Sequence, residues 1–345
     1  MRRVLSFLMV LALIVGVAAV AGCSKQQAAT TGTGVLVAGD EGKVRRTYSP
    51  DDQYIYVGCM WNLEYFSNHK LGMEYAGKVF HVKTSIMGPA EYDIPAMVNA
   101  FEQAIAMQPA GILTFAVDPE IIPEINKAMD AGIPVVTICG DQPTSKRLTF
   151  IGTNQYEVGL FGGQKLAAMM NGKGKVAILT IPGTAMFDER ERGYRDGMKG
   201  MTVVAVGDTK ADIPTGINVA KSILAAHPDL DAFVCTDSVG AISAATAVKE
   251  AGLAGKIKII GMDRNNDVLQ LIKDGVVTAT VAQNDALMPF LGVALLYYYN
   301  YTMVPITMNN KEAGVSAMPQ YVYTGQIWID SSNYSSFIMN TSGGQ

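Results

Sequence analysis

Polar and aromatic side chains follow the ends of several strand-like stretches, and their types suit the binding of a small hydroxylated molecule. In the first half of the chain, Trp61, Tyr65 and Phe66 come after YIYVGC, and Asp141 comes shortly after PVVTIC. The second half contributes an arginine, two carboxylates and an amide in similar positions: Arg190, Asp237, Asp263 and Gln283. Sugar hydroxyls pair with charged and amide groups, and sugar C–H faces pack on aromatic rings. Together these residues predict a sugar-binding site.

Arg190 lies where cations are usually avoided, which raises the question of its role. The stretch KVAILTI ends at a Pro-Gly pair, and we expect a helix from about Asp188, with Glu191 as its capping-box partner. The amino end of a helix already carries partial positive charge, so a cation there needs another reason. At a strand end, the five N–H donors of the Arg190 guanidinium would form hydrogen bonds to ligand oxygens. The alternative is an ion pair with an acidic neighbour, which is what we expect for the solvated Arg192.

Structural roles compete with the binding roles at several of these positions. An aspartate after a strand often serves only as a helix cap, and this is our interpretation of Asp118. Trp61 and Phe66 could be core residues, and Glu64 is expected on the surface. The polar residues of the second half could likewise have structural roles alone.

Composition and motifs argue against several other classes of function. The net charge is −4 and no basic cluster after residue 3 is larger than Arg45-Arg46, so we expect no nucleic acid partner. The chain has no Walker A, nucleophile-elbow or HExxH pattern, and GLFGGQ at 159–164 departs from GxGxxG and falls in a helical stretch. The histidines are scattered and no CxxC pair occurs. We therefore expect no catalytic residue, no cofactor and no metal, and we interpret Cys59, Cys139 and Cys235 as small apolar residues at strand ends.

The N-terminus is typical of an export signal. Residues 1–22 contain two arginines followed by an apolar stretch, and we expect them to be a signal peptide. The segment VAGC resembles the lipobox of bacterial lipoproteins, which implies cleavage before Cys23 and its lipid modification. An ordinary signal peptide or a membrane helix with an incidental cysteine is the alternative. Residues 23–51 then form a lipidated tether with a mean span of about 30 Å, which predicts an extracytoplasmic, membrane-anchored protein.

Short β-rich stretches alternate with helix-length segments twice along the chain, at about 54–151 and 175–283, and we expect stretches such as YIYVGC, VFHVKT and KVAILTI to be strands. Such alternation predicts parallel sheets covered by helices, so we expect an α/β fold with two doubly wound parallel-sheet lobes. In sheets of this kind the ligand crevice lies at the carboxyl ends of the strands, where the candidate residues are found.

Six stretches taken together resemble the type I periplasmic solute-binding proteins of the ribose/galactose class, which serve ATP-driven transporters. The likeness covers about 54–330, and the stretches are GILTFAVDPEIIPEINKAMDAGIPVVTI, FIGTNQYEVG, ERERGYRDGM, ILAAHPDLDAFVCTDS, IIGMDRNNDVLQLIKDG and TATVAQNDALMPFLGV. The resemblance implies the periplasmic binding protein-like I fold, with two lobes joined by three hinge crossings near 153–154, 283–284 and 323–325. It implies an N-terminal lobe of 52–153 plus 285–323 and a C-terminal lobe of 154–284 plus 324–345.

The resemblance also implies roles for individual residues in the second half. Arg190 falls on the ligand-binding arginine of the family's RERG stretch, and Asp237 falls on an Asn/Asp ligand position. Asp263 matches the ligand aspartate of the GxD stretch, and Gln283 matches a polar ligand position.

In the first half the match to the family is less complete. Tyr65 and Phe66 fall on the aromatic pair that stacks against sugar. The aspartate usual after the fourth strand is Cys139 here, with Asp141 two residues on, and Leu63 replaces the usual asparagine before the aromatic pair. The ribose pattern is therefore not intact, and the identity of the sugar is not predicted.

The resemblance and the candidate residues predict a monomeric substrate-binding lipoprotein that captures a monosaccharide or polyol and delivers it to an ABC permease. One alternative is a protein of the same fold that binds a furanosyl quorum signal or a nucleoside. A chemoreceptor partner and an enzyme are the remaining alternatives.

Overall fold

In the computed structural model, two sheets with helices on both faces form the body of the protein. The structure describes residues 46–302, 313, 315–316 and 318–338. The expected signal peptide, Cys23 and most of the expected tether lie outside these residues. Among the residues described, no helix is both long and apolar enough to span a membrane.

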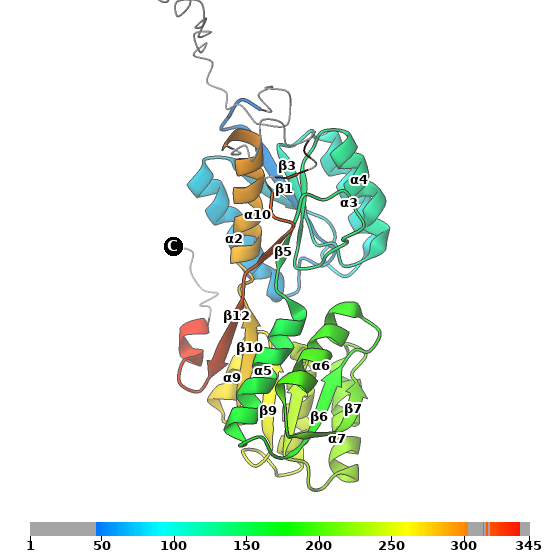
Figure 1. Cartoon of the computed structure of the whole chain (residues 1–345), viewed down its shortest axis with the longest axis vertical. Helices are drawn as coiled ribbons and strands as arrows, with labels where there is room; N and C mark the ends of the chain where they lie inside the picture. Colours follow the sequence, from blue (N-terminus) through cyan, green and yellow to red (C-terminus); the bar gives the residue numbers. More distant parts are fainter. Residues whose placement is uncertain (1–45, 303–312, 314, 317, 339–345) are drawn as a thin grey trace, which may run out of the picture. The chain divides into compact units, whose positions relative to one another are not determined.

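The first sheet has the strand order β11-β5-β4-β3-β1-β2, and all of its pairings are parallel. Its strands are β1 Gln53–Val57, β2 Lys83–Met87, β3 Gly111–Thr114, β4 Val135–Ile138, β5 Thr149–Gly152 and β11 Tyr321–Tyr323. Helices α2 and α10 pack side by side on one face, and α3 and α4 cover the other (Figure 1). These helices are α2 Tyr65–Phe80, α3 Ile94–Ala106, α4 Ile122–Asp130 and α10 Leu287–Tyr297. We call this unit the first lobe.

The second sheet has the strand order β12-β10-β9-β8-β6-β7. Its strands are β6 Lys175–Thr180, β7 Thr202–Asp208, β8 Ala232–Cys235, β9 Lys258–Met262, β10 Ala279–Gln283 and β12 Gln326–Asp330. Its helices are α5 Gln155–Met169, α6 Ala185–Gly197, α7 Ile213–Ala226, α8 Ser238–Glu250 and α9 Asn266–Lys273. The pairings are parallel except that β12 runs antiparallel to β10, which we did not expect from the sequence. We call this unit the second lobe.

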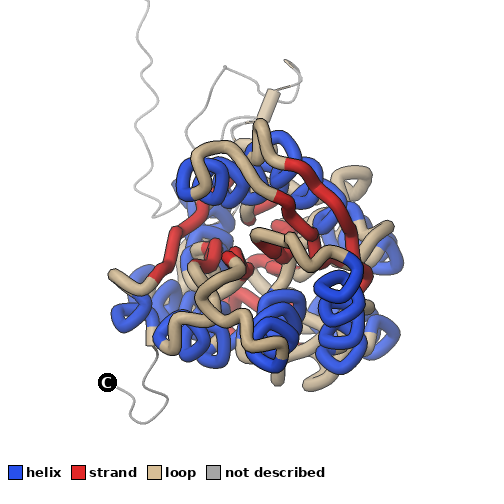
Figure 2. The backbone as a smooth tube through the Cα atoms, turned by 90° about the horizontal axis from the view of Figure 1, so that it is seen from below, coloured by secondary structure: helices blue, strands red, loops and turns tan. Residues whose placement is uncertain are grey.

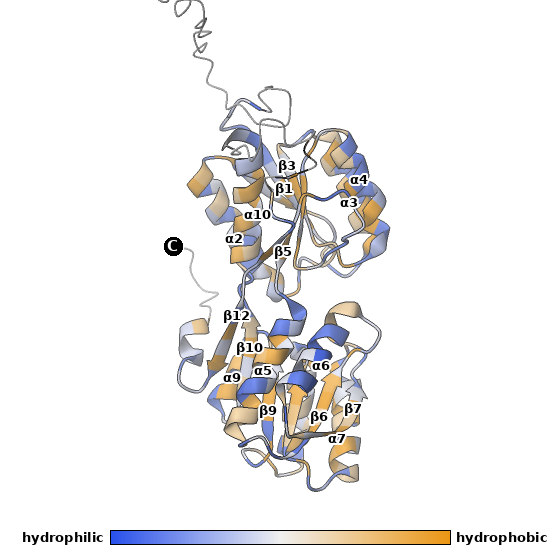
Figure 3. Ribbon diagram, in the orientation of Figure 1, coloured by the Kyte–Doolittle hydropathy of each residue, from blue (hydrophilic) through white to orange (hydrophobic). Residues whose placement is uncertain are grey.

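The inner strands of the second lobe are buried on both faces, as β6 illustrates. Val176 and Ile178 pack with residues of α5 and α6, whereas Ala177 and Leu179 pack with residues of α7 and α8. A strand covered on both faces must be apolar at consecutive positions. This explains why KVAILTI is a continuous apolar run and why the strands are mostly orange in Figure 3.

The chain passes between the two lobes three times. β5 is followed by α5, β10 is followed by α10, and β11 is followed by β12. The last link is only Thr324-Gly325, in which Gly325 takes the left-handed conformation with φ 73°. The three expected crossings and the expected two-lobed α/β fold are therefore confirmed. Figure 2 shows the helices grouped around the strands.

Two local predictions are wrong. The stretch VFHVKT is not one strand, because α2 continues to Phe80 and β2 begins only at Lys83. The helix that carries Arg190 begins at Ala185 rather than near Asp188. Asp188 instead accepts a hydrogen bond from the Gly183 N–H (3.0 Å), which precedes the helix. Asp188 thus reaches back from the first turn of the helix to Gly183, the residue before the N-cap Thr184.

Candidate functional site

The carboxyl ends of the strands carry most of the predicted site residues. Asp141 comes shortly after β4, while Asp237 and Asp263 follow β8 and β9. Gln283 is the last residue of β10, and Tyr65 begins α2. Parallel strands end at the same edge of their sheet, so this topology gathers the polar residues of each lobe on one side.

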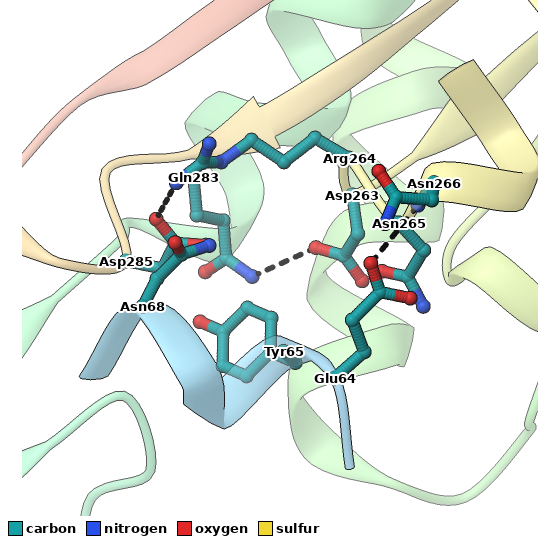
Figure 4. A pocket seen from close by; sticks show the side chains of 9 residues that line it. All are labelled: Glu64, Tyr65, Asn68, Asp263, Arg264, Asn265, Asn266, Gln283 and Asp285. Carbon is teal, nitrogen blue, oxygen red and sulfur yellow. Dashed lines mark hydrogen bonds and ion pairs between the residues drawn. The ribbon is translucent and has the colours of Figure 1, made fainter. Parts of the chain in front are cut away.

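Tyr65, Asp263 and Gln283 line one small polar cavity, which we call the Tyr65 cavity (Figure 4). Gln283 Nε2 donates to Asp263 Oδ1 (3.2 Å), and Gln283 Oε1 accepts from the Thr153 hydroxyl (2.8 Å). Tyr65 comes from the first lobe, and Asp263 and Gln283 come from the second. The cavity has a volume of about 20 Å³, and roughly 10–15 Å³ is enough for one water. It therefore brings three predicted residues together in an arrangement that holds about one water, and a sugar bound to these residues requires the space between them to widen.

Arg190 is buried and keeps one donor nitrogen free. Its side chain is 2% exposed. Nε donates to Gln155 Oε1 (2.6 Å), and Nη1 donates to the Thr236 carbonyl (2.6 Å). Nη2 is buried without a hydrogen-bond partner among the described residues. An unsatisfied buried donor costs about 1–3 kcal/mol, and more on a charged group, so a ligand oxygen bound to Nη2 would recover that free energy.

Close packing of α5 against α6 fixes the position of Arg190. A Cβ on Gly159 would lie 2.0 Å from the Arg190 carbonyl oxygen, and a Cβ on Gly193 would lie 2.1 Å from the Tyr156 carbonyl oxygen. Only glycine allows two helix backbones to approach this closely. The GLFGGQ stretch is helical, as expected, but the packing role of its first glycine was missed in the sequence. The repeated glycines in both helical stretches could have indicated that the two helices pack closely.

Asp237 and Asp263 are two carboxylates whose charges interact with Arg190. Burial, together with the Asp263 charge, raises the pKa of Asp237 to about 6, against the opposing effects of a Gly240 N–H hydrogen bond and of Arg190. Burial also raises the pKa of Asp263, and Arg190 and the hydrogen bond from Gln283 oppose that rise. Asp237 Oδ1 accepts from the Gly240 N–H (2.8 Å) as the cap of α8. The cap involves one carboxylate oxygen and leaves Oδ2 for another donor.

Cys139 lies at the end of β4 in contact with Tyr65. Its φ is 65°, and its Sγ is 3.3 Å from the Tyr65 hydroxyl oxygen. Burial raises the pKa of the Cys139 thiol to about 11, which keeps it protonated and unreactive near neutral pH. Cys59, Cys139 and Cys235 are all buried free thiols, as the sequence predicted.

Asp141 is engaged within the first lobe. Arg147 Nε donates to Asp141 Oδ1 (2.5 Å) and Nη2 donates to Oδ2 (2.6 Å), while the Thr137 hydroxyl donates to Oδ1 (2.7 Å). Asp141 lines a different cavity of about 490 Å³, which we call the second cavity. The structure therefore does not bring Asp141 into the Tyr65 cavity. Arg147 was missed in the sequence, although its spacing of six residues from Asp141 fits a turn closed by an ion pair.

Trp61 and Phe66 lie in the core and line neither cavity. Trp61 is 6% exposed and donates its indole N–H to the Met87 carbonyl (2.7 Å). Its ring meets Phe66 edge-on at 5.6 Å, and Phe66 meets Tyr65 edge-on at 5.3 Å. In this structure Phe66 packs against the Tyr65 ring and Trp61 packs against Phe66. This agrees with the alternative interpretation that Trp61 and Phe66 are core residues.

Six further residues line the Tyr65 cavity, and three of them, which we did not select from the sequence, are joined to one another by hydrogen bonds: Asn68, Arg264 and Asp285. Asp285 Oδ2 accepts from Asn68 Nδ2 (2.8 Å), and Oδ1 accepts from Arg264 Nη2 (2.7 Å). The carboxylate thus links α2 of the first lobe to the loop after β9 of the second. Asp285 could have been selected from the sequence, because it comes shortly after the β10 stretch, as the other candidates follow their strands.

Glu64 makes a second contact between the lobes. Its Oε1 accepts from the backbone N–H of Asn266, the first residue of α9 (3.1 Å). The amino end of a helix favours a carboxylate. Glu64 is exposed, as the sequence predicted, but its partner was not foreseen.

Within the part of the chain that the structure describes, no group of three or more His, Cys, Asp or Glu side chains could hold a metal ion. The site instead combines a buried arginine, carboxylates, amides and a tyrosine ring. Such a set can exchange hydrogen bonds with a neutral, hydroxylated ligand.

The chain belongs to the periplasmic binding protein family, because the family model described as "Periplasmic binding protein domain" matches residues 61–300. The resemblance to type I solute-binding proteins seen in the sequence is thereby confirmed.

The chain is similar to several proteins whose names refer to sugars. The D-ribose/D-allose-binding protein of Pseudomonas aeruginosa is 29% identical over 213 residues, which cover 59% of this chain and 67% of that protein. The ribose import binding protein of Bacillus subtilis is 28% identical over 229 residues, which cover 66% and 74%. The structure of AraP, an arabinose-binding protein of Geobacillus stearothermophilus, is 30% identical and has a TM-score of 0.78, covering 84% of this chain and 100% of that one.

Proposed function

We propose that this protein is an extracytoplasmic substrate-binding lipoprotein that captures a monosaccharide or polyol and delivers it to an ABC permease. The observation that carries the proposal is the buried Arg190, which has one free donor next to Asp237 and Asp263. The sugar names of the relatives and of the structural neighbour support the same class of ligand.

Each residue of this group has a defined part in binding. Arg190 Nη2 donates to a ligand oxygen, and Asp237 and Asp263 accept from ligand hydroxyls. The Tyr65 ring covers a C–H face of the sugar, and Gln283 offers a further polar contact. Asp237 and Asp263 bind as carboxylates, because an ionised acceptor makes a stronger hydrogen bond to a hydroxyl.

Binding couples the two lobes. We propose lobe boundaries at 52–153 plus 285–323 and at 154–284 plus 324–345, which is supported by the strands that share each sheet. A ligand held by Tyr65 on one lobe and by Arg190, Asp237 and Asp263 on the other makes all of its contacts only when the lobes are close. The ligand favours the closed state because it binds that state more tightly than the open one. The permease then recognises the closed, ligand-bound protein.

Apart from residues 46–51, the N-terminal proposals concern residues outside the described ones. Residues 1–22 act as a signal peptide, Cys23 carries the lipid, and 23–51 tether the monomeric binding domain to the membrane. The apolar stretch that ends in VAGC supports this assignment. The binding role involves no catalysis.

The test is to identify the ligand directly. Freshly purified protein is denatured, the released small molecule is identified by mass spectrometry, and its affinity is measured by calorimetry on refolded or ligand-free protein. We expect an unmodified monosaccharide or polyol. Release of a nucleoside or a furanosyl signal molecule would replace the sugar by that ligand on the same fold, and recovery of a chemically converted molecule would overturn the binding-protein proposal.

A further inference from the structure

The second cavity is much larger than the Tyr65 cavity and exceeds the needs of one sugar ring. Its volume is about 490 Å³, compared with about 20 Å³. A cavity of about 150 Å³ accommodates a benzene ring, so the second cavity has room for roughly three rings of that size. A site for a single ring leaves much of this space unexplained.

The second cavity adjoins the proposed sugar site. At three points, a residue that lines the second cavity is hydrogen-bonded to a residue of the proposed sugar site. The three contacts are Cys139 with Tyr65 (3.3 Å), Thr153 with Gln283 (2.8 Å) and Gln155 with Arg190 (2.6 Å). These cavity residues come from the end of β4, the end of β5 and the start of α5, so the contacts are spread over the shared wall. A ligand bound to Arg190 and Gln283 therefore has the second cavity as its neighbour.

Aromatic side chains from three elements line the second cavity. Phe150 lies on β5, Tyr156 on α5 and Tyr323 on β11. Phe150 and Tyr323 meet edge-on with centroids 6.4 Å apart, while Tyr323 remains 52% exposed. Aromatic rings beside backbone and amide groups suit a sugar ring, which has C–H faces and a rim of hydroxyls.

The charges on the wall of the second cavity are already paired. Asp141 is bound by Arg147, and Glu189 is bound by Arg192 (2.5 Å). Neither carboxylate is therefore unpaired and available to form an ion pair with a charged ligand group. The wall therefore favours a neutral group over an acidic or basic one.

We propose that the second cavity is a subsite for the neutral second ring of a disaccharide whose first ring binds at Arg190, Asp263 and Gln283. This inference rests on the proposed sugar-binding function. It extends the substrate class from single sugars to two-ring sugars, with Tyr323 as a residue that recognises the second ring and Tyr65 as one that recognises the first.

The experiment is calorimetry of the full chain with sugars that share a ring: glucose with cellobiose and maltose, galactose with lactose and melibiose, and xylose with xylobiose. At least one disaccharide is expected to bind more tightly than its own monosaccharide. Tyr323→Ala is then expected to weaken disaccharide binding by about 3- to 10-fold, from the loss of one ring contact. The same variant should leave monosaccharide binding within about 2-fold.

Tyr75→Ala is the matched control. Tyr75 lies on α2 and is 53% exposed, close to the 52% of Tyr323, but it does not line the second cavity. If a monosaccharide binds and every disaccharide fails, the subsite is refuted while the proposed function stands. If a disaccharide binds but both tyrosine variants behave alike, the assignment of the second ring to this cavity is refuted. Failure of every sugar, with a non-sugar ligand recovered from the protein, would refute both proposals.

Discussion

Replacing Asp237 by asparagine should remove a pH dependence of stability that arises from the site itself. The pKa of Asp237 is about 6 in the folded protein, compared with an ordinary value of 3.8. A carboxyl with a raised folded-state pKa binds its proton more tightly in the folded protein than in the unfolded chain. Its contribution to stability is therefore complete below the unfolded pKa and is lost as the pH rises through about 6.

The size of this effect follows from the shift. Two pKa units correspond to about 3 kcal/mol, and about 2 kcal/mol of this is lost between pH 4 and pH 7. Asp237→Asn has the shape of the protonated carboxyl and keeps the oxygen that accepts from the Gly240 N–H, so the helix cap is retained. The variant should gain about 2 kcal/mol of stability over the wild type as the pH is raised from 4 to 7.

Urea unfolding of the ligand-free protein, followed by circular dichroism at several pH values, measures this difference. Asp267→Asn removes the same charge from an exposed position in the first turn of α9 and serves as the control. A difference between Asp237→Asn and the wild type that stays constant from pH 4 to pH 7 would show that burial does not perturb this carboxyl. The variant should also bind ligand more weakly, because it lacks the carboxylate.

Three further predictions concern binding, anchoring and conformational change. Arg190→Ala should weaken ligand binding by about 10- to 150-fold in calorimetry, because a hydrogen bond to a charged group contributes about 1.5–3 kcal/mol. Arg192→Ala should have much less effect, since Arg192 is exposed and paired with Glu189; equal effects would remove Arg190 from the site. Cys23→Ala should release the protein from the membrane fraction with unchanged ligand affinity, and continued sedimentation with membranes would contradict lipid anchoring. Small-angle scattering should give a smaller radius of gyration with the ligand bound, and an unchanged radius at saturation would contradict ligand-driven closure.

Periodicity and residue type were sufficient for the fold because each signal is local. Continuous apolar runs such as KVAILTI predicted β6, which is buried on both faces. The antiparallel β12 was not foreseen, because the sequence stretch QIWID carries no mark of the direction of its partner. The start of α6 was misplaced because Asp188 caps backward from within the helix, and a sequence cannot distinguish this from a cap in front of it.

The candidate site was predicted less completely, because side-chain partners depend on long-range packing. Arg190, Asp237 and Asp263 were selected from their strand-end positions, and the structure gives them mutual electrostatic effects. The pairing of Asp141 with Arg147 depends on the path of the loop between them and competes with the predicted ligand role. The contact of Asn68 with Asp285 joins residues 217 positions apart, which no local pattern reveals.

The short link between β11 and β12 has a consequence for how the protein folds. β11 adds to the edge of the first sheet beside β5, and Thr324 bonds to the Gly152 carbonyl across 172 positions of sequence. β12 adds to the edge of the second sheet after only Thr324-Gly325. One continuous segment, β11 followed by β12, therefore adds the last strand to both sheets. The two lobes complete their folding together, and they do so through contacts between residues distant in sequence, which slow folding. A fragment ending before residue 321 would leave β5 and β10 as unprotected edges at once, open to self-association.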